Sequence, residues 1–565
     1  MKELTLEQAS AAYEAAKNER SDWEQEWRDV SDYLLPGRGV YQLYTRPRKR
    51  ALTSKKVINT VAEDALYVLT SGMHGALTSP ALPWFKLSWT NQQISQFEPL
   101  KMWLQDCEEK LHTALQQSNF YSIINSFYTE YAGFGTGCVY VGEDTDDAFK
   151  PFRFELLTAG EYAFAVDALG RPNEFFRILF KTPAQIVEMF GRAASENTRR
   201  YVTENRPEQN SLFLPILEVI RKEKYGDKKY TQRFYEFSTD AKRDVEKPLA
   251  TAGFYEWPYP LARWSTIGSD VYGVGPGSRA LPDIKRLQEM EKAFLMATHK
   301  TLDPPVNAPA RMRGKLNTLP GGVNYYANPN EAVKELYQVR FDFQGISAAV
   351  ERVEQRIQRN FFNDIFLSAS RDPNASPYKA AEVIARDQEK MLRLGPIVER
   401  LQNEFLQPII ERCFNIMLRK EMFMPLNPEL AEMAGDYRIS LVSPLATAQR
   451  GVALQGINSF LAFIGQAAQF SQEILDNVDV DEAARTYGDI TGVKLGILRP
   501  QEAVDAIRKQ RAEMMAQEKA KQDAMMQAQV GSQINAEQAT AQKTQAEAGQ
   551  ILADTQQTAR ATGMI

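Results

Sequence analysis

Two long helical patterns on either side of a short segment rich in proline and glycine constrain the fold of this chain most. Over residues 278–300, large apolar side chains recur at spacings of three and four, which is typical of a helix with one buried face. Asp303 and two prolines end this pattern, and a segment containing Pro320 and two glycines leads to a second helical pattern over 344–367. The sequence therefore predicts two long helices that flank a compact excursion.

The second helical pattern carries its apolar and its basic residues on different faces. At about 100° per residue the large apolar side chains fall within about 80° of one another, and three arginines fall on nearly the opposite side. The apolar set is Ile346, Val350, Val353, Ile357 and Phe361, and the basic set is Arg352, Arg356 and Arg359. The apolar face is predicted to pack. For the basic face two interpretations are open: solvent-facing arginines that pair with Glu351, Glu354 or a neighbouring subunit, and a surface that contacts nucleic acid.

The rest of the chain predicts an α+β region followed by helices, so the expected fold class is α+β and mainly helical. Residues 4–34 and 57–77 have helical patterns, whereas 131–260 alternates short apolar runs with glycine, proline and aspartate turns. Helical patterns return from about 378 to 420 and over 446–486.

Beyond residue 500 the composition changes. No aromatic residue occurs there, and alanine, glutamine and methionine predominate. These residues have high helix propensity but supply few large core side chains. The tail is therefore predicted to be an exposed helix, a helix assembled with copies of itself, or partly disordered.

Composition and charge narrow the class of protein. A chain of 565 residues is expected to contain two to four substructures. Its formal net charge of -5 argues against a protein that coats nucleic acid, so any DNA that it handles is not expected to be gripped tightly. The widely spaced Cys107, Cys138 and Cys413 suit reduced thiols made in a cytoplasm. Neither a secretory signal nor a run of about eighteen apolar residues is present, so membrane insertion is not expected.

No motif in the sequence specifies an active site. The glycine runs 133–137 and 273–277 lack the Lys-Ser/Thr of a phosphate-binding loop, and Pro276 removes a backbone donor, so turn formation is the favoured interpretation. The three histidines lack metal-ligand spacing, and acidic pairs such as Glu108-Glu109 are interpreted as solvated surface charges. We expect no catalytic residues, no cofactor and no metal.

Three stretches of the sequence, taken in order, resemble the head-to-tail connector family of T7-like, short-tailed bacteriophages. The first contains Tyr33-Leu34-Leu35-Pro36-Gly37-Arg38-Gly39, Ile58-Asn59-Thr60-Val61-Ala62, Leu77-Thr78-Ser79-Pro80 and Pro83-Trp84-Phe85-Lys86-Leu87. The second contains the two glycine runs, the latter followed by Ala280-Leu281-Pro282-Asp283-Ile284. The third contains Ala381-Glu382-Val383, Arg386, Glu389, Leu394-Gly395-Pro396, Glu404, Pro408 and Glu411-Arg412. Pro377-Tyr378-Lys379 replaces a small or threonine-rich run that is common in such proteins.

The resemblance implies a dodecameric ring with a wing, a stem, a clip and a crown around an axial channel. The implied segments are N-terminal helices and an α+β wing over 1–275, a stem helix over 276–302, a clip over 303–343, a second stem helix over 344–367, a channel loop over 368–377, wing and crown helices over 378–440, a crown over 441–500 and a helical or disordered tail over 501–565.

The function implied by the resemblance is that of a portal at one capsid vertex of the virion, made in the host bacterial cytoplasm. Double-stranded DNA would pass through it, without sequence specificity, during packaging and ejection. The implied partners are the major capsid protein, the scaffold protein, the terminase large subunit, and the tail adaptor and tail proteins. The candidate channel residues are Arg352, Arg356, Arg359, Arg371 and Lys379, and the candidate clip residues are Arg311, Arg313 and Lys315.

Two other classes of protein stay open at this point. A portal-binding tail adaptor or internal virion protein is one, and a packaging ATPase or nuclease, which the missing phosphate-loop lysine disfavours, is the other. Trp23, Trp27, Trp84 and Trp103 are candidates for a subunit interface, although core packing is the favoured role for each.

Overall fold

The computed structural model divides the chain into two units, residues 1–478 and 479–565, which are described separately. The described residues are 4–36, 56–81, 83–91, 97–144, 150–236, 247–317, 319, 321–326, 328–329, 332–336, 342–366, 393–426, 428, 437–441, 460–467, 478–479, 481, 483 and 501–561. The fold is α+β and mainly helical, as predicted.

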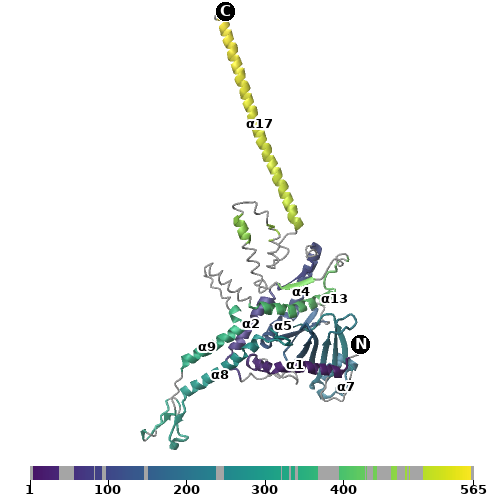
Figure 1. The fold of residues 1–565 in the computed structure, drawn as a ribbon, viewed down its shortest axis with the longest axis vertical. Helices are drawn as coiled ribbons and strands as arrows, with labels where there is room; N and C mark the ends of the chain where they lie inside the picture. The colour runs from purple at the N-terminus through teal and green to yellow at the C-terminus, as the bar shows by residue number, and fades with distance from the viewer. Residues whose placement is uncertain are drawn as a thin grey trace. The chain divides into compact units, whose positions relative to one another are not determined.

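A five-stranded antiparallel sheet forms one side of the first unit (Figure 1). Its order is β4-β5-β6-β7-β8, with bounds Tyr162–Val166, Pro172–Lys181, Leu214–Arg221, Tyr230–Glu236 and Ala250–Phe254. Helix α1 (Leu6–Tyr33) begins at a capping box formed by Thr5 and Gln8, and it lays Tyr13 against Phe176 of the sheet. Short helices α6 (Pro183–Phe190) and α7 (Glu196–Thr203) lie between β5 and β6. The predicted α+β region is therefore confirmed.

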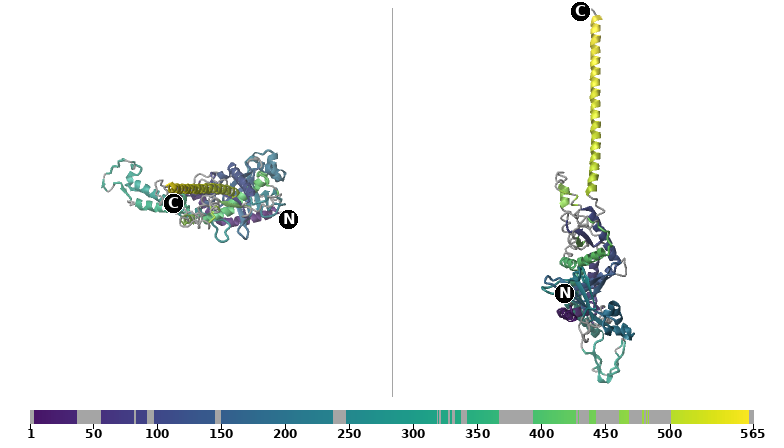
Figure 2. Two further views of the ribbon diagram at one scale, coloured as in Figure 1. Left: turned by 90° about the horizontal axis from the view of Figure 1, so that it is seen from above. Right: turned by 90° about the vertical axis from the view of Figure 1, so that its right-hand side faces the viewer.

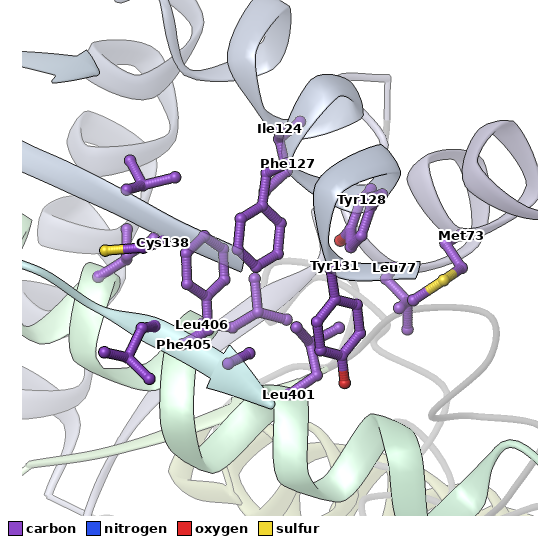
Figure 3. Close-up of a cluster of buried hydrophobic side chains, with 14 of the residues drawn as sticks. Met73, Leu77, Ile124, Phe127, Tyr128, Tyr131, Cys138, Leu401, Phe405 and Leu406 are labelled. Carbon is purple, nitrogen blue, oxygen red and sulfur yellow. The ribbon is translucent and has the colours of Figure 1, made fainter. Parts of the chain in front are cut away.

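The main core gathers helices from distant parts of the sequence around a three-stranded sheet (Figure 3). The sheet order is β3-β2-β9, with bounds Phe152–Leu157, Thr136–Glu143 and Leu261–Arg263, and the helices are α2 (Val61–Leu77), α5 (Phe120–Phe134), α12 (Gly395–Leu401) and α13 (Gln407–Arg419). A π-helical turn, Gln402–Leu406, joins α12 to α13 and turns Phe405 onto Phe127, with ring centroids 3.6 Å apart. Trp27 and Trp84 are buried in this core, so their predicted core role is confirmed.

A small two-stranded sheet lies beside the core. Strand β1 (Phe85–Trp89) pairs antiparallel with β12 (Tyr437–Leu441), and helix α4 (Glu98–Gln117) packs on β1. Glu108 of α4 accepts a hydrogen bond from the Leu87 N–H at 2.9 Å. Burial raises the pKa of Glu108 to about 7. The prediction that Glu108 is a solvated surface charge is therefore wrong.

The two glycine runs meet each other in the structure, although about 140 residues separate them. Gly135 ends α5 in the left-handed region at φ 76°, and a Cβ there would overlap the Gly273 carbonyl oxygen. Trp264 N–H donates to the Gly135 carbonyl at 2.8 Å, and Gly273 N–H donates to the Thr136 hydroxyl at 2.9 Å. The predicted turn role is confirmed, and the junction also fixes where the next helix begins, after Gly275.

Two long helices project from the body of the first unit and carry the excursion at their far end (Figure 1, Figure 2). Helix α8 spans Pro276–Leu302, so the first long helix is confirmed. Helix α9 spans Phe343–Asn360 and stops short of the predicted residue 367. Phe362 adopts a left-handed conformation at φ 56°, which breaks the helix before the short α10 (Asn363–Phe366). Strands β10 (Val306–Asn307) and β11 (Lys334–Glu335) pair in the excursion.

The second unit is dominated by helix α17 (Gln501–Ala561). Its described side chains are almost all exposed, among them Met514, Met525 and Leu552. Of the predicted alternatives for the tail, the structure shows a helix. Within the part of the chain that the structure describes, no helix is long and apolar enough to span a membrane.

We predict that Gly135→Ala lowers the free energy of unfolding by about 3 kcal/mol or more, because the new methyl group must displace the backbone at Gly273. Gly268→Ala is the matched control, since Gly268 also has a positive φ, 60°, but has no atom within 4 Å of its Cβ position. The control variant is expected to lose only about 1 kcal/mol of unfolding free energy, because it adds backbone strain but no clash. Denaturant melts of both variants measure the difference, and equal losses would contradict a role for the glycine junction.

We predict that Glu108→Gln removes a pH dependence of stability. A raised pKa in the folded state adds stability below the unfolded pKa, and this stability is lost as the pH rises through about 7. The variant is therefore expected to match the wild type near pH 4, below the unfolded pKa, and to exceed it by about 3 kcal/mol at pH 8. Melting temperatures at the two pH values test this. Glu109→Gln, at the exposed neighbouring position, is the control and should follow the wild type.

Candidate functional site

The projecting helices α8 and α9 are antiparallel and share an apolar seam. Val353 and Ile357 of α9 are buried, as are Ile284 and Leu287 of α8. Farther from the body, Phe294 meets Phe343 edge to face, with ring centroids 6.0 Å apart. The predicted packing face of the second helix is therefore confirmed.

The residues that precede α2 clamp both helices to the body. Gln288 of α8 is buried, and its side-chain oxygen accepts hydrogen bonds from the N–H groups of Ile58 and Asn59 at 2.6 and 2.9 Å. The Asn59 side-chain amide donates to Glu291 of α8 at 2.9 Å and to Glu354 of α9 at 2.8 Å. These contacts use the backbone of Ile58 and Asn59, and α2 accordingly begins at Val61, four residues after the start that its pattern predicted.

A second clamp joins α8 to α1. Lys285 forms an ion pair with Asp29 at 2.7 Å, and Lys56 forms one with Asp32 at the same distance. Both ammonium groups lie over the Tyr33 ring, at 5.6 and 5.3 Å from its centroid. The hydrogen bond to Asp32 raises the pKa of Lys56 above its usual range. The base of the helix pair is thus held by polar contacts on two sides.

The three arginines predicted on α9 are all exposed. Arg356 forms an ion pair with Asp283 of α8 at 2.6 Å. Arg352 donates to the Ala348 carbonyl of its own helix at 3.1 Å. Within the described part of the chain, Arg359 has no ion-pair partner. The three arginines are solvent-facing, as one interpretation predicted, but within the described part of the subunit none of them pairs with Glu351 or Glu354, and Arg356 pairs with α8 instead.

Sequence reasoning missed two more arginines beside this site. Arg279 and Arg286 are exposed on α8 and lie one turn before and one turn after Asp283. Their helical phase relative to Asp283 could be read from the sequence. The opposing position of Arg356 could not, since the two helices meet only in the folded chain.

The excursion between the helices presents an apolar tip. Asn317 and Asn324 close it, because the Asn324 side chain accepts from the Asn317 N–H at 2.8 Å and donates to the Asn317 carbonyl at 2.7 Å. The sequence 316–330 contains no charged residue. Large apolar side chains in and near the tip stay exposed: Leu302, Leu319, Val323, Tyr325, Tyr326 and Leu336.

The structure describes only some of the other predicted site residues. Arg313 and Lys315 lie in the excursion, just before the apolar tip. Arg311 belongs to a short 3-10 turn, Ala310–Met312, but its side chain lies outside the described part. Arg371 and Lys379 lie outside the described residues altogether. In those residues that the structure describes, no cluster of three or more histidine, cysteine, aspartate or glutamate side chains could hold a metal ion.

Comparison with known proteins identifies the family. Residues 6–498 match the family described as bacteriophage head to tail connecting protein. The chain is 32% identical over 522 residues to the probable portal protein of Bordetella phage BPP-1, which covers 90% of this chain and 91% of that protein. It is 32% identical over 506 residues to the portal protein of Salmonella phage epsilon15, covering 88% and 89%. The chain therefore belongs to the bacteriophage head-to-tail connecting, or portal, protein family, which is structural and not enzymatic.

Proposed function

We propose that twelve copies of this chain form a ring at one capsid vertex of a short-tailed, T7-like phage, and that double-stranded DNA passes through its axis during packaging and ejection. The observation that supports a ring is the set of exposed apolar side chains at the far end of the helix pair α8 and α9. A lone subunit leaves Leu302 80% exposed and Tyr325 86% exposed, and large apolar side chains that stay exposed in one region are typical of an interaction site.

A ring requires contacts between different patches of neighbouring subunits. On α8 a row at heptad spacing begins with the buried Leu281 and Gln288 and continues to Leu295 and Leu302. Beyond the body this row has no cover within the described part of the subunit, and both leucines are exposed. We propose that the adjacent copy of the chain in the ring covers this row of α8.

The segments take the following roles in the proposal. Helices α8 and α9 are the stem, and α8, with 27 residues, is about 40 Å long. Residues 303–342 are the clip, and the five-stranded sheet, the three-stranded sheet and α1 belong to the wing. Residues 368–377 are the channel loop, and 441–500 are the crown. Copies of α17 pack against one another, because most helical stability in proteins comes from tertiary packing, and the described side chains of α17 are almost all exposed.

The proposed partners follow the same arrangement. The terminase large subunit and later the tail adaptor dock on the clip, with the uncharged tip as the contact and Arg311, Arg313 and Lys315 beside it. The major capsid protein and the scaffold protein contact the wing. The net charge of -5 per subunit supports a channel that passes DNA without holding it, and a few basic positions, including Arg371 and Lys379, centre the duplex.

We predict that the purified chain forms rings near 768 kDa, twelve times its 64.0 kDa mass, and that Leu302→Asp breaks them into smaller species. A carboxylate at this position must be desolvated in a subunit contact, which costs several kcal/mol. Light scattering with negative-stain images of the same peak measures the outcome. Leu169→Asp is the control, because Leu169 is 74% exposed on the wing and its variant should keep the ring. Rings of unchanged mass for both variants would exclude the α8 row as a subunit contact.

A further inference from the structure

Two rows of charged side chains lie where α8 meets α9. On α8 the row is Arg279, Asp283 and Arg286, and on α9 it is Arg352, Arg356 and Arg359. In each row the outer residues lie four positions before and three positions after the central one, so all three share one helix face. The ion pair between Asp283 and Arg356, at 2.6 Å, joins the rows at their centres. We name the five arginines the arginine patch.

The antiparallel course of the helices brings the rows into register. Arg279 and Arg359 both lie toward the body, and Arg286 and Arg352 both lie toward the far end. All five arginines are exposed, and Asp283 is the only acid among the six side chains. The next acid on this side of α8 is Glu289, one turn beyond Arg286. The arginine patch therefore carries a concentrated positive charge on a chain that is acidic as a whole.

We propose that the arginine patch binds phosphate groups of the double-stranded DNA backbone, with Arg279 and Arg286 contributing as directly as the arginines of α9. This inference rests on the proposed passage of DNA along the helix pair. Guanidinium groups suit phosphate because their planar array of donors forms paired, charge-assisted hydrogen bonds. Contacts of this kind position a duplex without reading its sequence.

The spacing of the patch fits a phosphate backbone. Seven residues of helix separate the outer arginines of each row, a rise of about 10 Å. This length covers about three base-pair steps of 3.4 Å. The Asp283 carboxylate neutralises Arg356 at the centre of the patch, while the four outer arginines stay free of ion pairs in the described part of the subunit.

Two opposite changes in charge test the proposal on the full chain. Arg279→Gln with Arg286→Gln is expected to weaken binding of a 30-base-pair duplex about tenfold or more at low salt, and to lower the slope of log affinity against log salt by about 0.9 for each phosphate that the variant no longer neutralises. Asp283→Asn is expected to tighten binding severalfold, because it removes the one carboxylate and releases Arg356. Fluorescence anisotropy over a salt series measures both. A purely structural role of these residues does not predict tighter binding for Asp283→Asn.

The control is Arg192→Gln with Arg200→Gln, which removes two exposed arginines of the wing and should leave the duplex affinity unchanged. The mass of every variant is measured in parallel, so that loss of the ring and loss of DNA binding are told apart.

Unchanged affinity and slope in an intact ring of the α8 variant would overturn the proposal. A fall in mass without a fall in affinity would overturn it too, and would assign the arginine patch to the subunit contact. A wild-type monomer would refute the ring while the duplex titration still tests the patch.

Discussion

The position of the helix pair depends on a contact between two stretches of backbone. Gly135 and Gly273 approach so closely that neither has room for a side chain, and the hydrogen bond from the Gly273 N–H to the Thr136 hydroxyl joins the two runs. Helix α8 begins just after this junction, at Pro276, so its direction is set where the backbone leaves the core. A glycine is required here because a Cβ would clash with a carbonyl group, which cannot rotate away as a side chain can.

Polar contacts then hold the helix pair against the body. Apolar packing alone leaves helices free to slide by small distances, whereas the amide of Asn59 must meet Glu291 and Glu354 together. Each of these hydrogen bonds has a charged acceptor, which makes it stronger than a neutral one. Lys285 adds a contact to α1 on another side. The base of the pair is consequently a rigid platform, and the charged rows of α8 and α9 are presented from it in fixed register.

The far end of the helix pair, unlike its base, leaves apolar side chains exposed. Beyond the body the apolar row of α8 and the uncharged tip between Asn317 and Asn324 lie in water. The two-stranded sheet of the excursion has only two residues in each strand, and such sheets have little stability of their own. These features are costly in a single subunit, and they become favourable when another protein surface covers them. The subunit is therefore organised in two zones, a base closed by its own contacts and an end that leaves apolar side chains exposed.

The sequence by itself determined the two long helices, the amphipathic character of α9, the α+β region and the turn role of the glycine runs, because each depends on spacing within one element. It also contained the landmarks that resemble the connector family. Only the tertiary structure decided that the two glycine runs touch and that Asp283 pairs with Arg356. It also decided that Glu108 accepts a hydrogen bond from strand β1 and that Phe362 ends α9 early. The physical reason is that a helical period specifies which face of a helix is apolar or charged, but not which distant segment lies opposite that face. That choice is made by the packing of the whole core.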